Sequence, residues 1–234
     1  MIWSDEFDGA AGSPVDSDTW QPDIGGHDWG NEELQYYTSG TENASLDGAS
    51  NLAIVVRHSG PQYTSARLIS KDRVAFTYGL VEARIRLPSG RGIWPAFWML
   101  GHNLDDVGWP QCGEIDVMEN VGKDPSVVHG TIHGPGYSGA AGITASHDAG
   151  SGLADSFHVY SVNWEPGRIR WYLDEQLYGT VTHADVQGKP WVFDHDFFLL
   201  VNVAVGGTLP GDPDSSVIFP QTMLIDYVRV YAPV

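Results

Sequence analysis

Apolar and polar residues alternate along short segments of this chain, and this period of two constrains the fold more than any other feature. Within residues 81–87 the apolar side chains are Val81, Ala83, Ile85 and Leu87, and the residues between them are charged. Such alternation is typical of an antiparallel strand with one face in a core and the other in solvent. The same pattern, bounded by Gly, Pro, Asp or Asn, predicts further strands over residues 52–57, 63–69, 157–164, 168–173, 197–205 and 224–231.

Helical signals are weak in the rest of the chain. No amphipathic helix longer than two turns, no internal repeat and no low-complexity linker is evident. Asp174 and Glu175 are predicted to turn a hairpin, and 28 glycines and 14 prolines fit many short strands joined by tight turns. The sequence therefore predicts one all-β domain over residues 1–234, a two-sheet antiparallel sandwich.

The charge of the chain restricts its partners. Thirty acidic residues against twelve basic ones give a formal net charge of −18 at pH 7. Nucleic acid and anionic membranes would be repelled by this charge, whereas a neutral polymer would not. No run of eighteen apolar residues predicts a membrane span. We expect a monomer that binds neither nucleic acid nor membrane.

The cysteine count and the first residues bear on the compartment. Cys112 is the only cysteine, so no internal disulfide is possible and its expected role is packing. Residues 1–5 have neither the basic nor the apolar region of a signal peptide. We interpret the chain as a secreted protein whose signal peptide has been removed and whose Met1 is an expression start.

Three acids are concentrated in residues 114–119, which read EIDVME. Glu114 and Asp116 obey the period of two, but Glu119 lies five positions after Glu114 and would point into the core of a regular strand. One extra residue at a β-bulge near Val117 or Met118 would return Glu119 to the face of the other acids. Bulges are frequent beside active sites because they re-aim side chains.

Acids gathered on one face repel one another, so at least one is expected to keep its proton where a free carboxyl has lost it. This difference in protonation between the carboxyl groups defines one acid and one base. Retaining cleavage of a glycosidic bond needs such a pair: an ionised carboxylate attacks the anomeric carbon, and a protonated carboxyl donates to the leaving oxygen. A metal site for a hard cation and a solvated acidic strand are the alternatives.

Aromatic residues suggest the kind of ligand. Of nine tryptophans, Trp94 and Trp98 lie four positions apart and are predicted to share a strand face, while Trp29 and Trp109 lie in Gly- and Asp-rich segments typical of loops. Exposed aromatic rings beside polar groups suit the flat apolar faces of sugars, and core packing is the alternative. His133 follows the acid segment, and an antiparallel neighbour would bring it to the acids. A lone histidine is nevertheless more often a structural group.

Six further segments accompany the acid motif, in a fixed order along the chain. They are WSDEF (3–7), WGNEELQYY (29–37), YTSARL (63–68), GIWPAFW (92–98), GTIHGPGY (130–137) and IDYVRVY (225–231). Together they make nearly the whole chain similar to the laminarinases of glycoside hydrolase family 16. The resemblance implies a concanavalin A-like β-jelly roll with an open cleft across a concave sheet. It also implies retaining hydrolysis of internal β-1,3 bonds in β-glucans such as laminarin or curdlan. An acid motif with one inserted residue is typical of laminarinases rather than lichenases and carrageenases.

The resemblance also implies roles for single residues. Glu114 matches the nucleophile, Glu119 the acid/base residue and Asp116 the residue that hydrogen-bonds the nucleophile, with His133 beside them. Four residues lie at positions expected to hold sugars on the non-reducing side of the cleaved bond: Asn31, Arg67, Trp94 and Trp98. Trp109 is expected to form an additional wall of this site.

Further implications concern calcium and the leaving-group side. No cofactor is implied for catalysis, but many family members carry a structural calcium on the convex face. By position its ligands here would be Glu6, the carbonyl of Gly48 and Asp226, an oxygen set that suits a hard cation. Leu209 stands where the family commonly has Trp, so an aromatic platform is expected to be missing there. A mixed-linkage β-1,3-1,4-glucanase and a non-catalytic carbohydrate-binding jelly roll are the alternatives.

Overall fold

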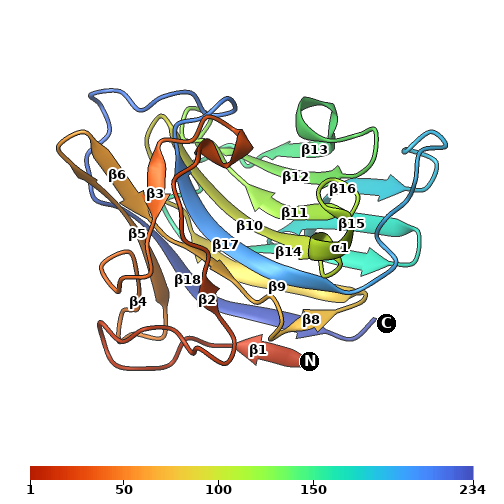
Figure 1. Ribbon diagram of the computed structural model, residues 1–234, viewed down its shortest axis with the longest axis horizontal. Coiled ribbons are helices and arrows are strands. Elements are labelled where there is room, and N and C mark those ends of the chain that lie inside the picture. Colours follow the sequence, from red (N-terminus) through yellow and green to blue (C-terminus); the bar gives the residue numbers. More distant parts are fainter. Residues whose placement is uncertain (234) are drawn as a thin grey trace.

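The computed structural model describes residues 1–233, which fold into two β-sheets packed against each other (Figure 1). The larger sheet has ten strands: β1 (Trp3–Asp5), β3 (Gln35–Tyr37), β4 (Ala44–Leu46), β5 (Leu52–Ser59), β6 (Gln62–Ser65), β9 (Gly79–Arg86), β14 (His158–Glu165), β15 (Arg168–Leu173), β16 (Gln176–Thr182) and β18 (Gln221–Tyr231). The smaller sheet has eight: β2 (Gln21–Pro22), β7 (Arg67–Ile69), β8 (Ala75–Phe76), β10 (Ile93–Gly101), β11 (Glu114–Glu119), β12 (Val127–His133), β13 (Ile143–Asp148) and β17 (Phe197–Val205). The connections contain the short helices η1 (Asp28–Gly30), α1 (Leu104–Val107) and η2 (Gly139–Ala141). The predicted all-β two-sheet sandwich is confirmed.

Strand order places the acid-bearing strand inside a sheet. The smaller sheet runs β13-β12-β11-β10-β17-β7-β2, with β8 paired to β17. The larger runs β16-β15-β14-β9-β18-β5-β6-β3, with β1 paired to β18 and β4 to β5. Strand β11 is therefore held on both sides, by β10 and β12, and its side chains have a defined register.

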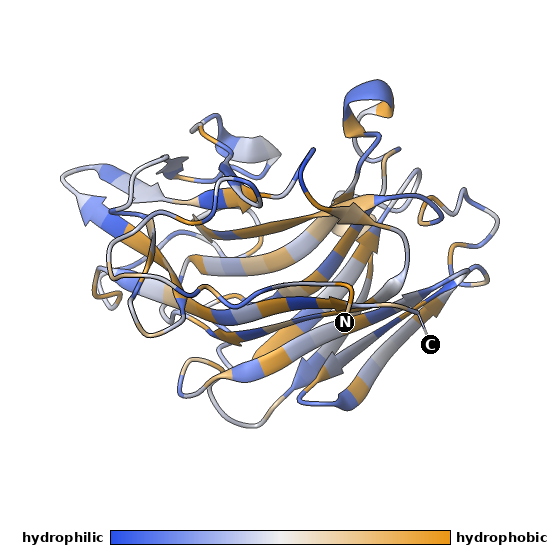
Figure 2. Ribbon diagram, turned by 90° about the horizontal axis from the view of Figure 1, so that it is seen from below, coloured by the Kyte–Doolittle hydropathy of each residue, from blue (hydrophilic) through white to orange (hydrophobic). Residues whose placement is uncertain are grey.

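The core lies between the sheets, as the alternating pattern requires. Figure 2 shows hydrophobic and hydrophilic residues alternating along the strands. The inward side chains of both sheets form one buried cluster that includes Trp164, Trp171, Phe97 and Phe197. Cys112 is also fully buried, which confirms its packing role. Within residues 1–233 no helix is long and apolar enough to cross a membrane.

Most predicted strands occur close to their expected bounds. Residues 168–173 and 197–205 coincide with β15 and β17. Asp174 and Glu175 turn the hairpin between β15 and β16, with φ values of 47° and 68°. Positive φ at both central residues is the geometry of a tight hairpin whose twist matches the strands.

The segment 63–69 differs from its prediction as one strand. The structure divides it into β6, in the larger sheet, and β7, in the smaller sheet, with the buried Ala66 between them. The Ser65 hydroxyl donates to the Val203 carbonyl of β17 at 2.6 Å, so the chain changes sheets at this point. Ser65 and Ala66 are consecutive and both fully buried, so the alternation shifts by one residue at the crossing, but this shift alone does not reveal that the chain changes sheets. In addition, β3 and β6 are parallel, an exception to the predicted antiparallel pairing.

Candidate active site

Strand β11 carries the three acids and contains the predicted bulge. The Cα partners between β10 and β11 are Ala96–Glu119, Phe97–Met118, Trp98–Asp116, Met99–Ile115 and Leu100–Glu114. Val117 has no partner in this register, so it is the extra residue. Because Ala96, Trp98 and Leu100 alternate along β10 and share one face, their partners share that face as well. The bulge thus brings all three acids to the same side of the sheet, as predicted.

A core tryptophan of the opposite sheet holds the bulge in place. The indole Nε1–H of Trp171, on β15, donates to the backbone carbonyl of Asp116 at 2.7 Å. Trp171 is completely buried. A Cβ added at Gly130 would lie 2.3 Å from Trp171 Cδ1, so only glycine at this β12 position leaves room for the indole. The carbonyl next to the bulge is therefore satisfied from within the core.

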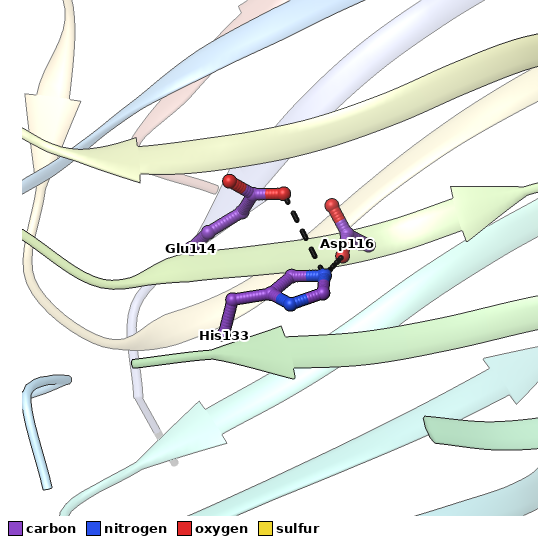
Figure 3. A group of neighbouring side chains, drawn as sticks. All are labelled: Glu114, Asp116 and His133. Carbon is purple, nitrogen blue, oxygen red and sulfur yellow. Dashed lines mark ion pairs between the residues drawn. The ribbon is translucent and has the colours of Figure 1, made fainter. Parts of the chain in front are cut away.

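His133 lies beside two of the acids (Figure 3). It is the register partner of Glu114 on the antiparallel strand β12. Its Nε2 atom is 3.2 Å from Asp116 Oδ2 and 3.8 Å from Glu114 Oε1. The prediction that a neighbouring strand brings His133 to the acids is confirmed. Glu114, Asp116 and His133 place one ligand-capable atom each within 4.8 Å of one another, so the same group could contact a cation.

Each glutamate is oriented by an indole donor. Trp109 Nε1–H donates to Glu114 Oε2 at 2.7 Å, and Trp94 Nε1–H donates to Glu119 Oε1 at 3.0 Å. The Thr131 hydroxyl lies 3.5 Å from Glu119 Oε2. Both tryptophans thus contact the acids directly. Trp109 is also exposed, as expected of a residue on a loop.

Burial changes the protonation of all three acids. It raises the pKa of Glu114 to about 8, and the negative charge of Asp116 adds to this rise. Burial likewise raises the pKa of Asp116 well above its usual value, with the charge of Glu119 adding to it, and burial raises the pKa of Glu119. A proton on Asp116 removes the charge that opposes ionisation of Glu114. A neutral Asp116 therefore makes the ionised form of Glu114 less unfavourable than it would be beside a charged Asp116.

Arg67 is enclosed between two tryptophans. Its guanidinium carbon lies 4.6 Å from the ring centroid of Trp29 and 4.8 Å from that of Trp98. Its Nε atom is 2.9 Å from Asp23 Oδ2. These contacts leave the Arg67 side chain only 14% exposed, so it mainly fixes the two rings and offers a small surface to a ligand.

Glu33 is a polar centre of the site that the sequence analysis missed. Its carboxylate accepts hydrogen bonds from Asn31 Nδ2 at 3.1 Å, Gln35 Nε2 at 2.6 Å and the Tyr37 hydroxyl at 3.3 Å. Burial raises the pKa of Glu33, while the hydrogen bonds from Asn31 and Gln35 act in the opposite direction. Asn31, a predicted sugar-binding residue, is therefore held by this carboxylate.

The same network continues to the face of the smaller sheet. Asn202 Nδ2 donates to the Tyr37 hydroxyl at 3.0 Å, and Trp98 Nε1 donates to Asn202 Oδ1 at 2.7 Å. Trp98 is thus connected to Glu33 through two intervening residues. The only local signal was that Glu33, Gln35 and Tyr37 alternate as polar residues, and nothing in the sequence links them to Asn202.

The predicted calcium ligands lie against arginines. Both carboxylate oxygens of Glu6 accept from Arg229, at 2.9 and 2.8 Å, and Asp226 pairs with Arg84. Gly48 has a φ of 82° and lies in a turn. Two carboxylates and a carbonyl suit a hard cation in kind, but a cation bound by them would compete with two guanidinium groups. Calcium binding at these residues stays a prediction.

Leu209 lies at the position where an aromatic platform was expected to be missing. The side chain is exposed, and its carbonyl accepts from Lys123 Nζ at 2.9 Å. The surface at this position is therefore aliphatic, and its place on the leaving-group side stays a prediction.

Comparisons with known proteins agree with this geometry. The profile of the Glycosyl hydrolases family 16 matches residues 28–228. The laminarinase catalytic domain of Thermotoga maritima MSB8 is 45% identical, with 100% of this chain and 98% of that chain covered and a TM-score of 0.93. The Beta-glucanase of Rhodothermus marinus is 44% identical over 247 residues, which cover 99% of this chain and 84% of that protein.

A third relative has a broader named specificity. It is a variant of a non-specific endo-β-1,3(4)-glucanase of the same family, co-crystallised with 1,3-β-D-cellotriosyl-glucose. It is 34% identical, with 99% of this chain and 94% of that chain covered and a TM-score of 0.89. The full-length similarity and the family match together establish that the chain belongs to glycosyl hydrolase family 16.

Proposed function

We propose that this protein is an endo-1,3-β-glucanase of the laminarinase type, which hydrolyses internal β-1,3 bonds of β-glucans with retention of configuration. The observation that carries this proposal is the bulge at Val117, which aligns Glu114, Asp116 and Glu119 on one face beside Trp94 and Trp109. Laminarinase relatives that cover the whole chain support the choice of β-1,3 bonds. A net charge of −18 is compatible with a neutral polymer as substrate.

The proposed reaction has two steps. Glu119 donates its proton to the glycosidic oxygen while the Glu114 carboxylate attacks the anomeric carbon, so the bond to the leaving chain breaks and a glycosyl ester forms. Glu119, now ionised, then takes a proton from a water molecule that attacks the same carbon and releases Glu114. Two displacements at one carbon return the β configuration.

Neighbouring residues are assigned supporting roles. A neutral Asp116 keeps the charge repulsion on Glu114 low, and His133, on β12, favours the ionised forms of Glu114 and Glu119. Asn31, Arg67, Trp94 and Trp98 are proposed to hold sugars on the non-reducing side, with Trp109 as a wall. Their indole and amide groups are held in place by hydrogen bonds, which limits the entropy lost when a glucan binds.

The catalytic roles are tested by two variants. Glu114→Gln removes the nucleophile and is expected to lower turnover by several orders of magnitude while laminarin binding persists. Added azide should not restore a retaining reaction. Glu119→Ala is expected to regain turnover with azide on substrates with good leaving groups, because the anion replaces water and needs no base. Near-wild-type hydrolysis by either variant would refute the role given to that residue.

The stereochemical outcome is a separate readout of the same proposal. Proton NMR of a fresh laminarin digest, recorded before mutarotation equilibrates the anomers, should show the β anomer first. An initial α signal would contradict the nucleophilic role of Glu114.

A mixed-linkage β-1,3-1,4-glucanase is the second candidate, supported by the similarity to a non-specific endo-β-1,3(4)-glucanase. Incubation with laminarin, lichenan and cellulose, followed by product analysis, separates the two activities. Hydrolysis of lichenan at a rate comparable with laminarin would favour the broader specificity. Binding of all three polymers without products would instead indicate a non-catalytic carbohydrate-binding protein.

Several properties that accompany this function stay predictions. We propose that the protein acts as a monomer outside the cell, where polymeric glucans occur. We also propose a stabilising calcium ion at Glu6, Gly48 and Asp226. The reaction itself uses carboxylates alone and needs no cofactor.

A further inference from the structure

A second groove lies beside β3 and β6, and none of the proposed catalytic or sugar-binding residues lines it. Its volume is about 400 Å³. Most of its lining comes from Leu34 and Tyr36, on or next to β3, and from Pro61, Gln62, Tyr63 and Thr64, on or next to β6. These two strands are neighbours at one edge of the larger sheet (Figure 1). The proposed function gives this groove no role.

The lining of this groove is unusual for so acidic a protein. Forty-two of the 234 residues are charged, yet no Asp, Glu, Lys or Arg lines the groove. The surface that remains combines tyrosine, leucine and proline with glutamine and threonine. An anion would be repelled by the net charge of −18, and a cation would find no carboxylate here to pair with. A neutral ligand with apolar faces and hydroxyl groups matches this chemistry.

Tyr36 presents a fixed aromatic surface to the groove. Its side chain is 51% exposed, and Leu34, two residues away on the same side of the chain, is 46% exposed. A Cβ added at Gly26 would lie 2.7 Å from Tyr36 Cδ2, so the ring rests closely on the backbone at Gly26. Thr64 is the register partner of Tyr36 on β6, and its hydroxyl oxygen accepts from Asn43 Nδ2 at 3.2 Å. Because the ring is already held in place, it loses little conformational entropy when a ligand binds.

The groove is continuous with the chain segment that builds the cleft. Along residues 33–37 the side chains alternate: Glu33, Gln35 and Tyr37 enter the hydrogen-bond network that reaches Trp98, whereas the exposed Leu34 and Tyr36 line the groove, which Gln35 also borders. One short segment thus has a side for each surface. A long polymer that occupies the cleft has further sugar units available close to the groove.

We propose that this groove is a second glucan-binding site, occupied by a stretch of β-glucan that lies outside the catalytic cleft. Tyr36 and Leu34 contact the apolar face of the sugars, and the exposed amide of Gln62 bonds their hydroxyl groups. The identity of the polymer rests on the proposed function. The site raises the affinity for long glucans, because a chain held at two places dissociates less readily than a chain held at one.

Native gel electrophoresis in laminarin tests the site without turnover. In a Glu114→Gln background, Tyr36→Ala should reduce retention by laminarin severalfold, and Tyr36→Trp should retain it because the aromatic face remains. Tyr172→Ala is the matched control: Tyr172 is a half-buried tyrosine in a groove on the outer face of β14 and β15 that is lined by Glu82, Asp174 and Glu175. Its retention should equal that of the parent. Equal retention of Tyr36→Ala and the parent would overturn the proposal.

Kinetics of the otherwise wild-type enzyme give an independent arm. Tyr36→Ala should raise KM for laminarin severalfold with kcat unchanged, and leave the hydrolysis of laminaripentaose, which is short, unchanged. An equal loss on both substrates would place Tyr36 in the cleft and refute a separate site. If the proposed function is wrong, the wild-type protein will not hydrolyse laminarin. The gel comparison does not depend on hydrolysis and would still decide whether the groove binds laminarin.

Discussion

Glu33 shows how one carboxylate can orient several side chains of the site. A carboxylate only accepts hydrogen bonds, so the Tyr37 hydroxyl must donate to it. The Tyr37 oxygen is then free to accept from Asn202 Nδ2, which turns Asn202 Oδ1 toward the indole of Trp98. The carboxylate of Glu33, at the end of this series, therefore determines which group donates in each of these hydrogen bonds.

Replacement of Glu33 by glutamine tests this orientation. An amide has one oxygen for the three donors that now share two, so Glu33→Gln should leave either Asn31 or the pair of Gln35 and Tyr37 without an acceptor, at a cost of about 1–3 kcal/mol. KM for laminarin oligosaccharides should rise more than kcat falls. The indole Nε1–H resonance of Trp98 should shift in ¹H–¹⁵N NMR spectra.

The neighbouring Glu32 provides the control for this variant. It is exposed, and Glu32→Gln makes the same change of charge one residue away. This variant should leave KM and the Trp98 resonance as in the wild type. An unshifted Trp98 resonance in Glu33→Gln would refute the connection through Tyr37 and Asn202.

At the scale of elements, the catalytic strand depends on a tryptophan from the other sheet. A bulge interrupts the ladder on both sides of β11, because the pairing with β12 also shifts between Asp116 and Glu119. The carbonyl of Asp116 then bonds to Trp171 Nε1–H in the core. The register that aligns the acids is therefore maintained by contact between the sheets as well as by pairing within one.

Replacement of Trp171 by phenylalanine is expected to affect catalysis as well as stability. The change leaves a buried carbonyl unpaired beside the bulge, at about 1–3 kcal/mol, in addition to the loss of packing volume. Trp164→Phe is a matched control, because Trp164 is equally buried and donates to the Phe193 carbonyl at 2.9 Å, at a place outside β11. Both should lower the melting temperature, but only Trp171→Phe should lower kcat strongly. Equal effects on kcat would exclude a specific role of Trp171 at the bulge.

At the scale of the whole molecule, the two ends of the chain are joined. Strand β1 pairs with β18, and Glu6 and Arg229 form an ion pair across 223 positions of sequence. Asp226, on the same last strand, pairs with Arg84 of β9. These are partly exposed pairs, and such pairs contribute little to stability by themselves. A calcium ion at Glu6 and Asp226 would add a stronger connection between the ends.

Calcium is therefore predicted to stabilise the folded protein. An ion that binds only the folded form at about 100 times its Kd adds about 2.7 kcal/mol, which corresponds to a rise of roughly 5–10 °C in melting temperature for a chain of this size. Activity at low temperature should hardly change. The measurement is thermal unfolding with calcium and with a chelator.

Competition with arginine makes this test sharper. Arg84→Met removes the partner of Asp226, so the shift produced by calcium should become larger in this variant than in the wild type. Identical melting curves with calcium and with the chelator, in both proteins, would rule out a stabilising site at these residues.

The predictable part of the structure consists of features that adjacent residues encode. The strand bounds at residues 168–173 and the need for a bulge between Asp116 and Glu119 follow from the period of two, residues 197–205 are a nearly continuous apolar run that is buried throughout, and the turn at Asp174 follows from the break after β15. A side chain's position on one face or the other of a strand depends on its immediate neighbours. These features were therefore evident from the sequence.

Contacts between distant residues were decided by the tertiary structure. Three features depend on positions that are remote in sequence. They are the division of residues 63–69 between two sheets, the pairing of Glu6 and Asp226 with arginines, and the hydrogen bond between Asn202 and Tyr37. Alternation is the same in either sheet and carries no information on which strands pair. Only the assembled sandwich brings Trp171 to Asp116 and Glu33 into connection with Trp98, because these contacts arise when the two sheets and the loop before β3 pack together.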